Sequence, residues 1–126
     1  MLIRLAAAAV LLVLCACSGP QAPFSPGFTA ELTPTPPVVG RELDVRLEVA
    51  EASVPLLDAA ALELEGHMTH PGMAPEVARL VEDAPGRYRA RIRITMAGEW
   101  VLLVTGRLAN GRPVREEVAR ATAVAE

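Results

Sequence analysis

The chain has 126 residues, which is enough for one domain but not for two. Its formal net charge is −3 at pH 7, so it lacks the surplus of basic residues that binding to phosphates requires, and we expect no nucleic acid among its partners. Both cysteines, Cys15 and Cys17, lie near the start, so no disulfide can stabilise the rest of the chain.

The first 16 residues have the pattern of a secretion signal. Arg4 precedes the apolar run Leu5 to Leu14, which is too short to cross a bilayer as a stable helix of about 20 residues. The end of this run, Leu-Cys-Ala-Cys, resembles a bacterial lipobox with Ala16 just before the acylated cysteine. We therefore expect residues 1–16 to be a lipoprotein signal peptide, and Cys17 to carry a lipid that anchors an extracytoplasmic, cell-envelope protein to a membrane. The alternative is an ordinary soluble signal peptide that is cut nearby.

The first part of the remaining chain contains a tether and two clear strands. Residues 17–27 are rich in proline, which favours extended chain, and we expect the folded domain to occupy residues 28–126. Phe28 to Leu32 is predicted as a first edge strand. Arg41 to Ala50 alternates apolar and charged residues, which is typical of a half-buried strand. Leu62 to Glu65 alternates in the same way, although Leu56 to Leu64 can instead begin as a short helix.

The second half of the chain predicts further strands separated by turns. Glu76 to Glu82 is a weaker strand candidate. Arg87 to Met96 is the most regular strand, with Met96 on the same apolar face as Ile94 and four arginines on the other face. Glu99 to Leu108 and Pro113 to Val124 are joined by an Asn-Gly hairpin signal. About seven short strands in some 100 residues predict an all-β sandwich of two sheets.

Two features of these strands each have two interpretations. Trp100 to Val104 is apolar at every position, which fits either a central strand covered on both faces or an exposed patch used for docking. The arginine stripe Arg87 to Arg93 fits either a solvated outer face paired with Glu42, Asp44 and Glu48, or a docking surface for an acidic partner or lipid head groups.

Four soft donor side chains gather between Gly66 and Pro75, namely His67, Met68, His70 and Met73. Imidazole and thioether groups together suit copper, above all Cu(I). The sequence His70-Pro-Gly-Met73 has the pattern of a type II turn, which would bring the two outer Cα atoms within about 7 Å. His70 and Met73 can then close on one ion, and we predict a metal site here.

The contributions of His67 and Met68 depend on where the preceding strand ends. If the strand continues to Met68, Met68 faces the core and His67 faces outward, so only one of them can face the turn. If the strand stops at Gly66, either residue can join the site. Zinc bound through Glu65, His67 and His70 is an alternative, but it leaves the methionines unexplained.

Three motifs in this region resemble the YtkA-like and FixH-like extracytoplasmic domains. They are Gly72-Met-Ala-Pro75, Gly86-Arg-Tyr-Arg-Ala90 and Met96-Ala-Gly-Glu-Trp100, and the resemblance covers roughly Thr33 to Glu117. It implies an immunoglobulin-like (cupredoxin-like) β-sandwich. It also implies copper delivery or cytochrome oxidase assembly outside the cytoplasm, with a copper-accepting membrane protein such as an oxidase subunit as a partner.

The residue inventory argues against enzyme activity. Ser53 is the only serine of the predicted domain, which has no cysteine, no glycine-rich phosphate loop and no recognisable pair of catalytic carboxylates. Two functions remain. The first is a copper-binding metallochaperone or assembly factor that uses His70 and Met73, with Met68 or His67. The second is a metal-free binding or scaffolding lipoprotein, accessory to a membrane or efflux complex.

Overall fold

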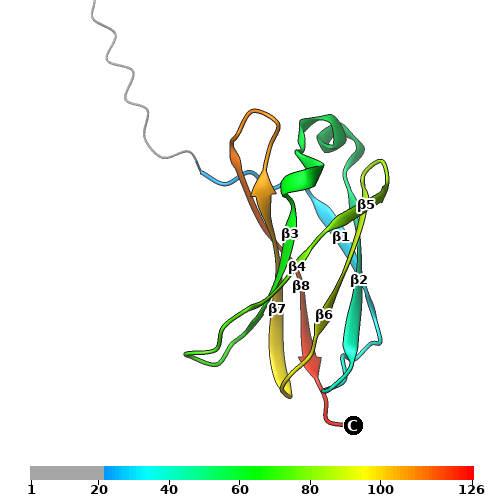
Figure 1. The fold of residues 1–126 in the computed structure, drawn as a ribbon, viewed down its shortest axis with the longest axis vertical. Helices are drawn as coiled ribbons and strands as arrows, with labels where there is room; N and C mark the ends of the chain where they lie inside the picture. The colour runs from blue at the N-terminus through cyan, green and yellow to red at the C-terminus, as the bar shows by residue number, and fades with distance from the viewer. Residues whose placement is uncertain (1–21) are drawn as a thin grey trace, which may run out of the picture.

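The structure is a computed structural model that describes residues 22–126, and it is a two-layer β-sandwich (Figure 1). One sheet has the strand order β1-β2-β6-β5 and the other β4-β3-β7-β8, with antiparallel pairing throughout both. The predicted all-β sandwich is therefore confirmed, with eight strands where about seven were expected. The strands are β1 (Phe28–Thr33), β2 (Glu42–Val49), β3 (Glu63–Met68), β4 (Glu76–Arg79), β5 (Val81–Ala84), β6 (Arg87–Arg93), β7 (Gly98–Arg107) and β8 (Pro113–Ala123).

The alternating segments form strands because their apolar faces meet between the sheets. In β2 every second side chain, from Leu43 to Val49, is buried, and the charged residues between them face outward. Tyr88 and Ile92 of β6 are buried in the same core. On the outer face, Asp44 lies 3.4 Å from the Arg89 guanidinium and 3.9 Å from that of Arg91, so two arginines of the stripe pair across strands with one of the three expected carboxylates.

The weak strand candidate at residues 76–82 is two strands in different sheets. Leu80 lies between them with its side chain buried, and its N–H donates to the carbonyl of Leu62 at 3.1 Å. Burying this one side chain moves the chain from one sheet to the other, so β4 pairs with β3 and β5 pairs with β6. The prediction of a single strand was wrong for this reason.

The segment before β3 contains two short 3₁₀ helices, η1 (Glu51–Leu56) and η2 (Ala59–Ala61). The carboxylate of Asp58 accepts a hydrogen bond from the N–H of Ala60 at 3.2 Å and so caps η2. The strand itself begins at Glu63. The two interpretations of residues 56–64 therefore apply to successive parts of the segment. Among the described residues, no helix is long and apolar enough to span a membrane.

The end of the predicted tether already contacts the domain. The N–H of Phe24 donates to the carbonyl of Pro113 at 2.8 Å, and Pro26 is buried, with its carbonyl accepting a hydrogen bond from the Ser53 hydroxyl at 3.0 Å. Phe24 and Pro26, within the segment predicted as a tether, therefore contact the sandwich. The predicted signal peptide and Cys17 lie outside the described residues.

Strand β7 is central in its sheet, between β3 and β8, as the simpler of the two interpretations expects. Trp100 and Leu102 are almost completely buried in the core. Val101 and Leu103 point the other way and are half-buried on the outer face of the sheet, where no further layer of the described chain covers them. The strand is therefore central but is covered on only one face.

Candidate metal site at the end of strand β3

Strand β3 continues to Met68, and this places His67 and Met68 on opposite faces of the sheet. Met68 packs against the hydrophobic core. His67 lies on the outer face, where its Nε2 is 3.3 Å from an oxygen of Glu65. The interpretation in which the strand runs on to Met68 is confirmed. The two side chains therefore diverge, and one ion at the end of the strand can take Met68 or His67 but not both without a local change.

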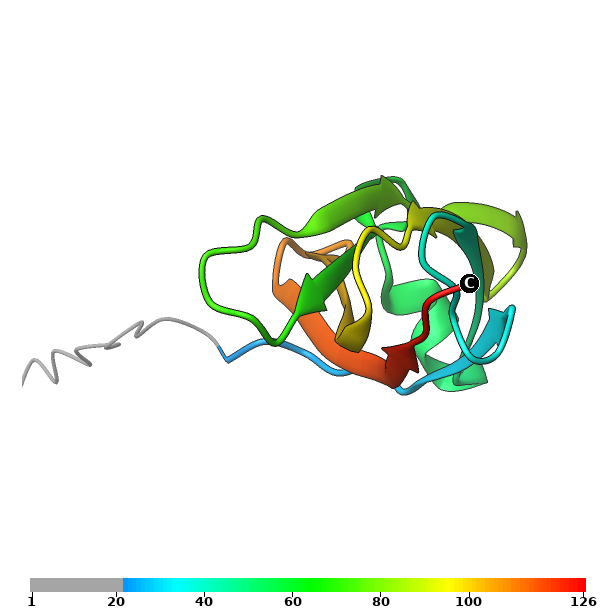
Figure 2. The same cartoon turned by 90° about the horizontal axis from the view of Figure 1, so that it is seen from below.

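The loop between β3 and β4 projects from the sandwich in two perpendicular views (Figures 1 and 2). Gly72 has φ of +81°, the value that the third position of a type II turn requires. His70 is exposed, and Met73 has 42% of its surface exposed. The structure thus places both predicted ligands in an open turn, where both side chains are exposed to solvent.

The loop is held to the sandwich at its base. The N–H of Thr69 donates to the carbonyl of Glu99 at 3.3 Å, next to the strand pair Met68 and Trp100. In the described part of the chain, residues 70–75 take part in no backbone hydrogen bond with the domain. The fold therefore fixes the position of Met68 and leaves the turn that follows it free of backbone restraint.

The buried side chain of Trp100 packs against the end of β3, at the base of this loop. Trp100 packs over Gly66, where an added Cβ would lie 2.7 Å from Ile92 Cδ1 and 3.4 Å from Trp100 Cε3. The indole N–H of Trp100 donates to the carbonyl of Met96 at 3.0 Å. Gly66 is the first residue of the His/Met stretch. Because it has no side chain, Ile92 and Trp100 can pack closely against the end of β3.

Met96 does not belong to the core, contrary to the sequence prediction. Strand β6 ends at Arg93, and the N–H and carbonyl of Ile94 pair with Arg41 and Gly40. The chain then turns, so the alternation that places Ile94 inside does not extend to Met96, which is 40% exposed. The glycine two residues after Met96 was the available signal that the strand had ended. The exposed thioether of Met96, near the base of the β3–β4 loop, was therefore not predicted from the sequence.

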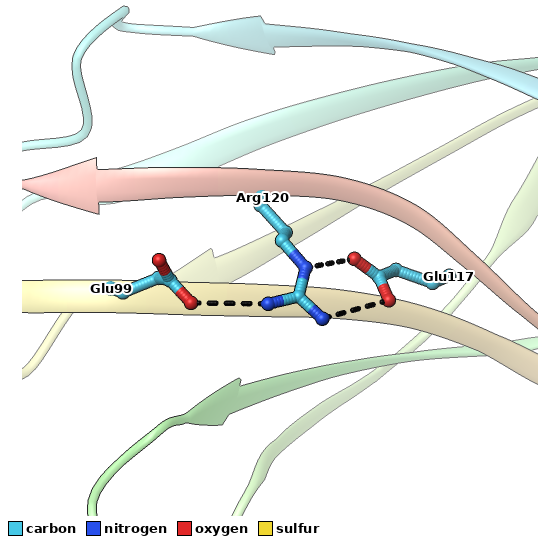
Figure 3. A network of polar contacts seen from close by, with 3 residues as sticks. All are labelled: Glu99, Glu117 and Arg120. Carbon is cyan, nitrogen blue, oxygen red and sulfur yellow. Dashed lines mark hydrogen bonds and ion pairs between the residues drawn. The ribbon is translucent and has the colours of Figure 1, made fainter.

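One acidic residue at the base of the loop, Glu99, belongs to an ion-pair network. Arg120 on β8 contacts both Glu117 and Glu99, and its distance to Glu99 is 3.2 Å (Figure 3). The hydrogen bond from Arg120 lowers the pKa of the Glu117 carboxyl below its ordinary value of 4.5. The carboxylate of Glu99, whose backbone carbonyl accepts the hydrogen bond from Thr69, shares this one guanidinium with Glu117, so the three groups together keep one net negative charge.

The described residues contain no group of three or more histidine, cysteine or acidic side chains that could hold a metal ion. Glu65 and His67 lie together, but His70 is not part of a three-ligand set with them. The zinc arrangement considered from the sequence is therefore not assembled in this structure. The thioethers of Met68, Met73 and Met96 remain as the additional donors at this end of the sandwich.

Comparison with known proteins identifies the family. The sequence model of the YtkA-like family matches residues 25–105, which include the whole His/Met stretch. The chain belongs to the YtkA-like family. This confirms the resemblance seen in the sequence motifs. No curated protein shows significant similarity to this YtkA-like chain.

Among solved structures, the fold is similar to that of a superoxide reductase (neelaredoxin) from Ignicoccus hospitalis. The two share 15% sequence identity, the TM-score is 0.51, and the match covers 79% of this YtkA-like chain and 80% of the reductase chain. At this identity the likeness concerns the fold alone, and it agrees with the two-sheet sandwich described above.

Proposed function

We propose that this YtkA-like protein is a membrane-anchored, extracytoplasmic copper-binding domain of the metallochaperone or oxidase-assembly type. The observation that carries the proposal is the projecting β3–β4 loop, which presents His70 and Met73 in an open turn directly after Met68. Neutral thioether and imidazole donors favour Cu(I) over harder cations. The binding function is therefore assigned to the loop and its base.

Transfer of an ion to a partner needs an open coordination sphere. His70 and Met73 are exposed, and residues 70–75 lack backbone hydrogen bonds to the domain in the described chain. A metal-binding side chain of the partner protein can approach the bound ion without displacing core residues. This arrangement supports delivery of copper rather than its permanent storage.

The proposed lipid on Cys17 would keep the loop close to a membrane partner such as an oxidase subunit. Only four residues separate Cys17 from Ala22, whose backbone carbonyl accepts a hydrogen bond from the Arg112 guanidinium at 3.2 Å. A fully extended chain of five residues reaches about 18 Å. The anchored domain would thus stay near the membrane surface, where a copper-accepting membrane protein can be reached.

Anaerobic competition with a chromophoric Cu(I) chelator tests the proposal. We expect the full-length chain in detergent to bind Cu(I), and the triple variant M68A/H70A/M73A to lose most of this affinity. A matched control removes three exposed apolar side chains without sulfur or nitrogen donors, L56A/V81A/V124A, and should bind as the wild type does. Equal copper affinity in the wild type and the M68A/H70A/M73A variant would overturn the proposal.

A second candidate is a metal-free docking domain, and the outer face of the β4-β3-β7-β8 sheet favours it. Val101 and Leu103 are half-buried there, and Val77 of β4 is 52% exposed. This candidate predicts that M68A/H70A/M73A keeps its cellular function while V101S/L103S loses it. The opposite pattern would exclude it in favour of copper binding.

A further inference from the structure

The end of β3 places the thioether of Met68 against the turn between β6 and β7. Met68 is the strand partner of Trp100, and a Cβ built on Gly98 would lie 3.1 Å from Met68 Cε. The side chain therefore runs along the start of β7 and not toward His67 on the other face. Any ion bound by Met68 must lie near this turn.

Met96 is in the same turn and has no place in the core. It is 40% exposed and lies two residues before Gly98, so its Cα is within about 7.6 Å of the Gly98 Cα. Its backbone is held by the hydrogen bond from the Trp100 indole to its carbonyl. A methionine side chain has three rotatable bonds, so its sulfur can reach an ion beside Met68 at little cost.

We propose that Met96 supplies a second thioether to the metal site, so that Met68 and Met96 form its fixed base and one donor of the loop, His70 or Met73, completes it. This inference rests on the proposed copper function and refines its ligand set. His67 is not a ligand, because it lies on the opposite face of β3 beside Glu65.

The donor atoms at this base favour a soft monovalent ion. Methionine sulfur is neutral, and the carboxylate of Glu99, the acidic residue of this turn, is engaged by Arg120 (Figure 3). A site of two thioethers and one imidazole or third thioether, without a carboxylate, holds Cu(I) or Ag(I) and discriminates against hard cations.

Trp100 reports on this site directly. It is the only tryptophan of the chain, it is the strand partner of Met68, and it is hydrogen-bonded to Met96. Cu(I) bound between the two sulfurs would change the emission of the indole, whereas an ion held only by the exposed turn would lie farther from it.

The experiment is a Cu(I) titration of the full-length chain in detergent, read by chelator competition and by Trp100 fluorescence. Met96→Leu keeps the size of the side chain and removes the sulfur, at an exposed position where the fold is not at risk. We expect M96L and M68L each to weaken Cu(I) binding by at least about ten-fold and to lose the fluorescence response. The matched control H67A should change neither.

Each result is decisive. If the wild type binds Cu(I) and M96L binds it equally well with an unchanged Trp100 response, the role of Met96 is overturned while the proposed copper function stands. If H67A weakens binding as much as M68L does, the assignment of the site to the inner face of β3 is overturned. If the wild type binds no Cu(I), both the proposed copper function and the role of Met96 are overturned.

Discussion

Strand β3 and the loop that follows it are consecutive in sequence, yet they are stabilised in opposite ways. Up to Met68, the chain pairs with β7 and packs over Trp100, so its side chains have fixed directions. From His70 to Pro75 it is exposed and makes no backbone hydrogen bond to the domain in the described chain. The sandwich thus orients the base of the proposed site and leaves the outer donor side chains of the loop without backbone restraint.

The largest effect on stability is expected from a substitution that creates a cavity in the core of the sandwich. Leu102 of β7 is fully buried beside this base. Leu102→Ala should lower the free energy of unfolding by about 2–5 kcal/mol, because it removes packed methyl groups and leaves a cavity. Urea unfolding followed by Trp100 fluorescence measures this. A loss below about 1 kcal/mol would show that the core is less tightly packed than described.

The close approach at Gly66 gives the next largest effect. Gly66→Ala should cost about 1–3 kcal/mol, because its Cβ meets Ile92 Cδ1 inside a packed core. Ile92→Val deletes that one methyl group, so the cost of G66A should fall in the I92V background. A double-mutant cycle of unfolding free energies measures the coupling. Additive effects would mean that Gly66 is required for some other reason.

Alkaline pH tests the buried face of β6. Burial raises the pKa of Tyr88 to about 12, and the carboxylate of Glu82 adds to this shift, although the Tyr88 hydroxyl has no hydrogen bond of good geometry among the described residues. The unfolded chain ionises near pH 10, so the contribution of Tyr88 to stability is complete below that pH and declines as the pH rises toward 12. At pH 11 the loss is on the order of 1 kcal/mol.

Tyr88→Phe has no ionisable group, so its free energy of unfolding should fall less than that of the wild type between pH 9 and pH 11. Unfolding curves at both pH values, for both proteins, give the difference. Equal losses in wild type and Y88F would show that other groups cause the alkaline sensitivity.

The smallest effect on stability is expected in the loop. His70→Ala together with Met73→Ala should change the free energy of unfolding by no more than about 0.5 kcal/mol, because both side chains are exposed. Thermal unfolding monitored by circular dichroism measures this. A larger loss would mean that the loop contributes to the fold, and the contrast with β3 would then disappear.

The sequence predicted the regular parts of the fold well. Period-two alternation in Arg41 to Ala50 and in Tyr88 to Ile94 identified β2 and β6, because each has one face in the core and one in water. The split at Leu80 escaped prediction, since a single apolar residue between two short strands does not show which sheet each strand joins. Met96 escaped for a related reason, because its alternation with Ile94 continues in the sequence after the strand has ended.

For the candidate site, the donor set and the family motifs could be predicted from the sequence, because the imidazole and thioether groups and their grouping in Gly66 to Pro75 are properties of the chain. Local chemistry also predicted the turn at Gly72. The three-dimensional fold was needed to show that His67 and Met68 diverge and that the Met68 methyl group lies against Gly98, two residues after Met96. The reason is physical: the direction of a side chain follows from where its strand ends and which strand it pairs with, and that pairing depends on residues far away in sequence.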